Sequence, residues 1–188
     1  SDLTTYTYYF NTENEVLSSA ETRKALSGAL DRNEIAKIRG NGAQAATGLV
    51  PTGVKNSGTK DDFRAKAGNV LSYNGAKVAK KGSITLIYNE ERSYEKEIAE
   101  YAKKQWDALG VKTAIKGVAS EEIDDIIKSG EFDVIGADIV SLTDDAFGFV
   151  VPFALKSSGT FVDVTTEVYN NPHFTGYENE AVNEIIET

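Results

Sequence analysis

Two groups of carboxylates are the first residues whose type and spacing could do chemistry. The first group opens a predicted helix and comprises Glu121, Glu122, Asp124 and Asp125. Negative charge stabilises a helix N-terminus, so we expect this group to act on the helix alone. Asp144 and Asp145 instead lie in a loop after a predicted strand, where carboxylates can contact a cationic ligand or a divalent ion. The spacing of a hard-cation loop is absent around them, so we predict no metal site and no cofactor.

Catalytic signatures are sparse in this chain. His173 is the only histidine, and it follows a proline in an irregular segment. No serine stands in the Gly-x-Ser-x-Gly pattern of a nucleophile elbow, so a Ser-His-Asp arrangement lacks its usual frame. The glycines of residues 39–48 follow a helix and lack a Gly-Lys-Ser/Thr sequence, so they do not indicate a phosphate site. A small α/β hydrolase that uses His173 is therefore kept only as a less favoured interpretation.

The composition excludes several other classes of protein. The 188 residues include 20 basic and 29 acidic side chains, and the net charge of −9 opposes contact with phosphates, so we predict no nucleic-acid partner. No apolar run approaches the roughly 18 residues of a membrane span. Cysteine is absent, which removes disulfides, thiol catalysis and thiolate metal sites. Methionine is also absent, so we expect the sequence to be an excerpt of a longer protein.

The elements that must position these residues alternate along the chain. An aromatic and β-branched strand at 4–12 is followed by helices at 18–30 and 31–39, a long loop at 40–59 and a helix at 61–72. The best-defined part has strands at 83–89, 111–115 and 132–140, helices at 94–109 and 120–129 between them, and a last helix at 179–187. This order predicts an α/β fold with a mixed or largely parallel sheet flanked by helices. We expect residues 1–188 to form a single α/β lobe.

Local signals refine three of these helices. Ser18 with Glu21, and Asp31 with Glu34, show the spacing of a capping box, and Ser120 is expected to cap the helix at 120–129. Trp106 lies on the apolar face of the helix at 94–109, so we expect it to pack in the core rather than to stack on a ligand.

The sheet itself points to a ligand wall. Ligands of open α/β sheets meet the loops at the carboxyl ends of the strands, which singles out the stretch after Val134. The candidate ligand-binding residues are Tyr9, Gly136, Ala137, Asp138, Ile139, Val140, Ser141, Leu142, Thr143, Asp144 and Asp145.

Eight short stretches occur in an informative order. They are "YYFNTE", "ETRKALSGALDRNEI", "LVPTG", "LIYN", "IAEYAKKQWDALGVKTAI", "GEFDVI", "VVPFA" and "GYENEAVNEII". Together they resemble the second ligand-binding lobe of the family 5 extracellular solute-binding proteins, which are oligopeptide, dipeptide and nickel receptors of ATP-driven importers. The resemblance implies one lobe of a type II, periplasmic-binding-protein-like receptor. It also implies that Arg23, Asp31 and Arg32 serve helix packing, caps and ion pairs rather than chemistry.

The resemblance carries expectations about function and partners. It implies a non-enzymatic substrate-binding component of an ABC transporter that captures extracellular peptides or another small ligand for import. The partners would be a missing first lobe of the same protein and an ABC permease. An upstream lipidated cysteine would anchor the protein at the membrane, giving a cell-surface lipoprotein or a periplasmic protein. A peptide-sensing or pheromone receptor of the same fold is the alternative.

The chain departs from the family pattern at several positions. In peptide-binding members, the strand matching "FDVIGA" is followed by a tryptophan and then by an acidic group that pairs with the peptide ammonium. Ile139 and Leu142 take these two places, and Gly136 stands where some members have an arginine. Further differences fall on Val16, Leu17, Ser19 and Asn183. Because an unpaired buried ammonium is costly, we expect blocked, apolar or unusual ligands, or recruitment of Asp144, Asp145 or the other lobe.

Overall fold

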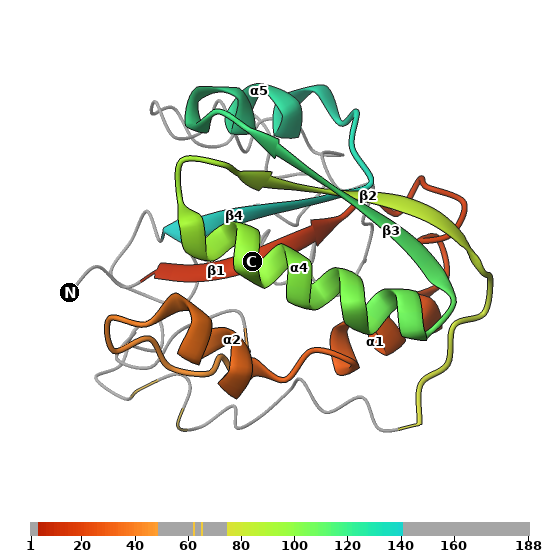
Figure 1. The fold of residues 1–188 in the computed structure, drawn as a ribbon. Coiled ribbons are helices and arrows are strands. Elements are labelled where there is room, and N and C mark those ends of the chain that lie inside the picture. Colours follow the sequence, from red (N-terminus) through yellow and green to blue (C-terminus); the bar gives the residue numbers. More distant parts are fainter. Residues whose placement is uncertain (1–3, 49–61, 63–64, 66–74, 141–188) are drawn as a thin grey trace, which may run out of the picture.

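A computed structural model describes residues 4–48, 62, 65 and 75–140 of the chain. Their core is a four-stranded sheet in the order β1-β4-β2-β3 (Figure 1). The strands are β1 (Thr4–Phe10), β2 (Gly82–Asn89), β3 (Val111–Val118) and β4 (Val134–Val140). The helices are α1 (Ala20–Gly28), α2 (Arg32–Arg39), α4 (Ser93–Ala108) and α5 (Ser120–Ser129).

The sheet is mixed. β2 runs parallel to both β3 and β4, whereas β1 pairs antiparallel with β4. The two connections between the parallel strands each carry a helix, α4 and α5, as parallel pairing requires. The predicted mixed α/β sheet flanked by helices is therefore confirmed.

Helices cover both faces of this sheet. In Figure 1, α5 lies on one face, and α4 with α1 lies on the other. Neighbouring residues along a strand accordingly enter different core clusters: Leu86 and Val134 pack with α4 and α1, while Ile87 and Ile135 pack with α5. Because both faces are covered, the last four residues of β2 are all buried, whichever face their side chains take.

Trp106 anchors the larger of the two clusters. Its side chain has no exposed surface, and its indole Nε1 donates a hydrogen bond of 2.9 Å to the Leu26 carbonyl oxygen. The rings of Tyr8 and Phe10 lie with their centroids 5.9 Å from that of Trp106. The predicted core role of Trp106 is confirmed, and the residue also joins α4 to α1.

Two predicted helix starts are one residue away from the observed ones. Ser19, not Ser18, caps α1 and accepts from the Thr22 amide, because the Ser18 hydroxyl donates to the Glu15 carbonyl oxygen. Ala119, not Ser120, is the N-cap of α5, and its amide donates to Glu122 over 3.0 Å. Asp31 caps α2 as predicted, since its carboxylate accepts from the Asn33 amide over 2.8 Å.

Arg23 of α1 and Arg32 of α2 donate hydrogen bonds to backbone carbonyl oxygens near the ends of α1. Arg23 Nη1 donates to the carbonyl oxygens of Leu17 and Ser18, at 2.9 and 3.0 Å. Arg32 donates to the Leu30 carbonyl oxygen and the Ser27 hydroxyl, each over 2.7 Å. These contacts stabilise the turns that precede and follow α1, so the expected structural role of both arginines is confirmed.

Other predicted boundaries shift or fall elsewhere. β3 extends to Val118, three residues beyond the expected end, and β4 begins at Val134 rather than at 132. The helix predicted at 61–72 lies mostly outside the described residues. The tail at 141–176 with His173, and the helix at 179–187, lie wholly outside them. None of the described helices is long and apolar enough to cross a membrane.

Candidate ligand-binding edge

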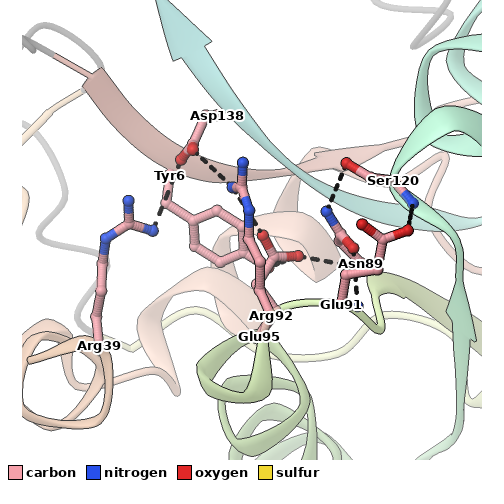
Figure 2. Close-up of polar contacts among 8 residues, drawn as sticks. All are labelled: Tyr6, Arg39, Asn89, Glu91, Arg92, Glu95, Ser120 and Asp138. Atoms are coloured by element: carbon pink, nitrogen blue, oxygen red, sulfur yellow. Dashed lines mark hydrogen bonds and ion pairs between the residues drawn. The ribbon is translucent and has the colours of Figure 1, made fainter.

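Polar side chains gather where the parallel strands end. β2 ends at Asn89, β4 passes Asp138 near its end, and the antiparallel β1 brings Tyr6 directly opposite Asp138. Figure 2 shows these three residues with five others at this edge: Arg39, Glu91, Arg92, Glu95 and Ser120. We refer to Tyr6, Arg39, Arg92, Glu95 and Asp138 as the edge cluster.

Arg92 links the two carboxylates of the edge cluster. It immediately precedes α4, and its Nη1 lies 2.9 Å from Asp138 Oδ2 and 3.3 Å from Glu95 Oε1. The Arg92 side chain is 41% exposed, whereas that of Glu95 is 2% exposed. The guanidinium therefore covers a buried carboxylate and keeps part of its own surface at the molecular boundary.

Arg39 approaches the same aspartate from the opposite side. It is the last residue of α2, and its Nη1 lies 3.7 Å from Asp138 Oδ1. The guanidinium carbon sits 4.8 Å from the ring centroid of Tyr94 and 5.7 Å from that of Tyr6. Cation–π contact with two rings fixes the orientation of Arg39, so α2 is held against the sheet at this edge.

Glu95 lies beneath this layer. Its Oε2 accepts from the Asn89 amide over 3.0 Å and from the Tyr6 hydroxyl over 3.4 Å. Burial raises the pKa of Glu95 above its usual range, although the Asn89 amide and Arg92 oppose this shift. Burial, with Tyr8 and Glu95 nearby, also raises the pKa of Tyr6 well above its ordinary value, so Tyr6 remains a neutral hydroxyl donor.

A second set of polar residues, Asn89, Glu91 and Ser120, connects the loop after β2 to α5. The Asn89 amide group donates to the Ser120 hydroxyl over 3.0 Å, and the Ser120 backbone amide donates to Glu91 over 3.1 Å. Asn89 also accepts from the Glu91 amide over 3.0 Å. These bonds join the carboxyl end of β2 to the start of α5, so this group supports the shape of the edge.

The predicted ligand residues fall into different surroundings. Asp138 belongs to the edge cluster, and Ala137 packs against the core beneath α5. Tyr9 and Ile139 are themselves members of that core, with 5% and 0% of their surface exposed. Their packing role is thus clear, and ligand contact by these residues stays a prediction.

Gly136 is constrained by its neighbours. A Cβ atom at this position would lie 2.3 Å from the Tyr6 hydroxyl oxygen and 3.0 Å from Tyr8 Cε1. Glycine is therefore required for Tyr6 to reach Glu95. Val140 ends β4, and Ser141, Leu142, Thr143, Asp144 and Asp145 lie outside the described residues, so their predicted ligand contacts also stay predictions.

Sequence reasoning missed Tyr6, Arg39, Arg92 and Glu95 as candidates. The three-residue spacing of Arg92 and Glu95 at a helix start was the one available signal, and alone it indicates only a local ion pair. No group of three or more His, Asp or Glu side chains suited to a metal ion occurs in the part of the chain that the structure describes. The edge cluster can orient and bind polar groups through its hydroxyl and guanidinium donors.

The fold is that of the type II, periplasmic-binding-protein-like proteins. The profile of the bacterial extracellular solute-binding proteins, family 5 (middle), matches residues 1–161. The chain therefore belongs to this family, as the resemblance implied.

A relative agrees with this assignment, and two solved structures share the fold. The periplasmic murein peptide-binding protein MppA of Escherichia coli K12 is 27% identical over an alignment of 183 residues, and the match covers 92% of this chain and 33% of MppA. Listeria monocytogenes OppA bound to peptide superposes with a TM-score of 0.82 at 18% identity, over 99% of this chain and 38% of that one. The pheromone receptor PrgZ superposes with a TM-score of 0.75 at 21% identity, over 100% of this chain and 38% of PrgZ. The chain thus spans about a third of the length of MppA.

Proposed function

We propose that the protein containing this chain captures peptides outside the cytoplasm and delivers them to an ABC permease. This chain would supply one wall of the ligand cleft, and the part of the protein beyond it would supply the facing lobe. Family membership supports the substrate-binding role, and the relative MppA is named as a peptide-binding protein. Location in the periplasm or at the cell surface, with or without a lipidated cysteine, belongs to the same proposal.

The observation that carries this proposal is the edge cluster. Its donors and charges lie at the carboxyl edge of an α/β sheet, which is the usual place of a ligand in such sheets. The side chains of Arg39, Arg92 and Asp138 are 27%, 41% and 21% exposed. A lobe with such an edge can provide oriented polar contacts to a peptide backbone, while a second lobe excludes water.

Calorimetry on the full-length protein tests the proposal. Free peptides of two to six residues should bind, and free amino acids should not. Comparing one peptide in its free and N-acetylated forms then tests the consequence of Leu142: the acetylated form should bind at least as well as the free one. A strong preference for the free terminus that survives Asp144→Asn with Asp145→Asn would assign the ammonium to the other lobe.

The alternative functions are separated by other assays. A hydrolase would show esterase or peptidase turnover that is lost in His173→Ala, and this result would overturn the binding role. A signalling receptor would bind one peptide sequence far more tightly than shuffled versions, and uptake of labelled peptide would not depend on it. We expect uptake to fail when the protein is deleted, as an importer component requires.

A further inference from the structure

The edge cluster contains two arginines that point at one carboxylate of the chain itself. Figure 2 shows Asp138 between Arg39, which comes from α2, and Arg92, which precedes α4. Each guanidinium approaches a different oxygen, with Arg92 Nη1 at 2.9 Å from Oδ2 and Arg39 Nη1 at 3.7 Å from Oδ1. Asp138 is thus shared by two cations from separate elements.

Two guanidinium groups that converge on one point form a strong binding site for a carboxylate or a phosphate. In this chain the point is occupied by Asp138. The fit is incomplete: Arg39 Nη1 and Asp138 Oδ1 are both buried without a hydrogen-bond partner among the described residues. Asp138 therefore neutralises Arg39 across 3.7 Å without accepting a hydrogen bond from its Nη1.

The positions of the arginines do not depend on Asp138 alone. Arg39 is stacked on Tyr94 at 4.8 Å, and Arg92 is also paired with Glu95. Removal of the Asp138 charge would thus leave two oriented, partly exposed guanidinium groups above a single buried carboxylate. The local charge would change from balanced, with two cations and two anions, to an excess of one positive charge.

We propose that Asp138 is a specificity-determining residue that occupies the anion position between Arg39 and Arg92 and so excludes an acidic group of the ligand from this part of the edge. The ligand residue that lies over Asp138 is then neutral or basic. This inference rests on the proposed peptide-binding function, because it assumes that the edge cluster faces the ligand.

The test uses the full-length protein and a defined set of probes. Alanine pentapeptides, each prepared in a free and an N-acetylated form, carry either Glu or Gln at one position, and calorimetry measures the ratio of the two dissociation constants at each position. The variants are Asp138→Asn, which keeps the side-chain shape, and Asp138→Ser, which also removes bulk. Asp124→Asn makes the same charge change at an exposed position on α5 and serves as the matched control.

The wild-type protein should prefer Gln over Glu about tenfold at one position, the size expected for one partly exposed charge-assisted contact. In Asp138→Asn and Asp138→Ser this ratio should fall to one or invert at that position only, and Asp124→Asn should retain the wild-type ratio. Adding Arg39→Gln to Asp138→Ser should remove the gain in affinity for Glu. Thermal melts of each variant confirm that the compared proteins are folded.

Two results would overturn the inference in distinguishable ways. Unchanged ratios in both Asp138 variants, with peptides still bound, would refute the role of Asp138 and leave the proposed function standing. Absence of binding for every pentapeptide by the wild-type protein would refute the proposed peptide-binding function and this inference with it.

Discussion

Replacement of Gly136 by alanine should loosen the edge cluster through a defined clash. The new Cβ atom would lie 2.3 Å from the Tyr6 hydroxyl oxygen, well inside contact distance, and 3.0 Å from Tyr6 Cζ and from Tyr8 Cε1. The Tyr6 ring would have to move away from Glu95, with which its hydroxyl is bonded. Overpacking of this kind costs about 1–3 kcal/mol, so Gly136→Ala should lower the free energy of unfolding by that amount.

A second substitution shows whether the clash is the cause. Tyr6→Phe deletes the atom at 2.3 Å and leaves only the two contacts at 3.0 Å, which need shifts of a few tenths of an ångström. Tyr6→Phe alone should cost about 0.5–1 kcal/mol, since it removes one hydrogen bond. In the Tyr6→Phe background, Gly136→Ala should then cost about 1 kcal/mol less than in the wild type, a coupling well above the scatter of independent sites.

Urea unfolding monitored by Trp106 fluorescence and far-UV circular dichroism measures all four free energies of the cycle. Gly82→Ala is the matched control, because its Cβ atom would clash with Val16 Cγ2 at 2.5 Å, away from Tyr6. Gly82→Ala should lower the free energy of unfolding by the same amount with or without Tyr6→Phe. Additive effects of Gly136→Ala and Tyr6→Phe would refute the packing role assigned to Gly136.

Three further predictions concern other parts of the lobe. Trp106→Ala should lower the free energy of unfolding by about 3–5 kcal/mol, because it removes a fully buried side chain; an unchanged urea midpoint would contradict the packing described for α4. Arg23→Ala should cost more than about 0.5 kcal/mol through loss of its bonds to the backbone carbonyl oxygens of Leu17 and Ser18, and a smaller cost in the same assay would make Arg23 a solvated surface charge. Glu95→Gln should alter the pH dependence of stability. The raised pKa of Glu95 means that its favourable contribution is fully present below the ordinary carboxyl pKa of about 4.3 and is lost as pH rises through the folded-state pKa. The free energy of unfolding of Glu95→Gln relative to wild type should therefore increase with pH across this window, and a constant difference would show that Glu95 is not the titrating group.

The sequence alone determined the elements and their order. Apolar residues at helical spacing marked α4, and glycines at 110 and 130 ended helices in positive-φ conformations of +88° and +68°. These features depend on neighbours a few residues apart, so local patterns are sufficient to find them. Even there, the N-caps Ser19 and Ala119 lie one residue from the predicted Ser18 and Ser120. Contacts in the turns before the helices decide which of two neighbouring residues becomes the cap.

Tertiary structure alone decided the composition of the edge. Arg92 and Asp138 are 46 residues apart, and they meet because β4 inserts between β1 and β2 in the sheet. The same insertion pairs Gly136 with Tyr8 and Asp138 with Tyr6. Gly136, which the sequence suggested as a ligand residue, therefore leaves the space that the Tyr6 side chain occupies. Strand order is set by burial summed over the whole core rather than by any local spacing, which is why the sequence indicated the edge but not the side chains that meet there.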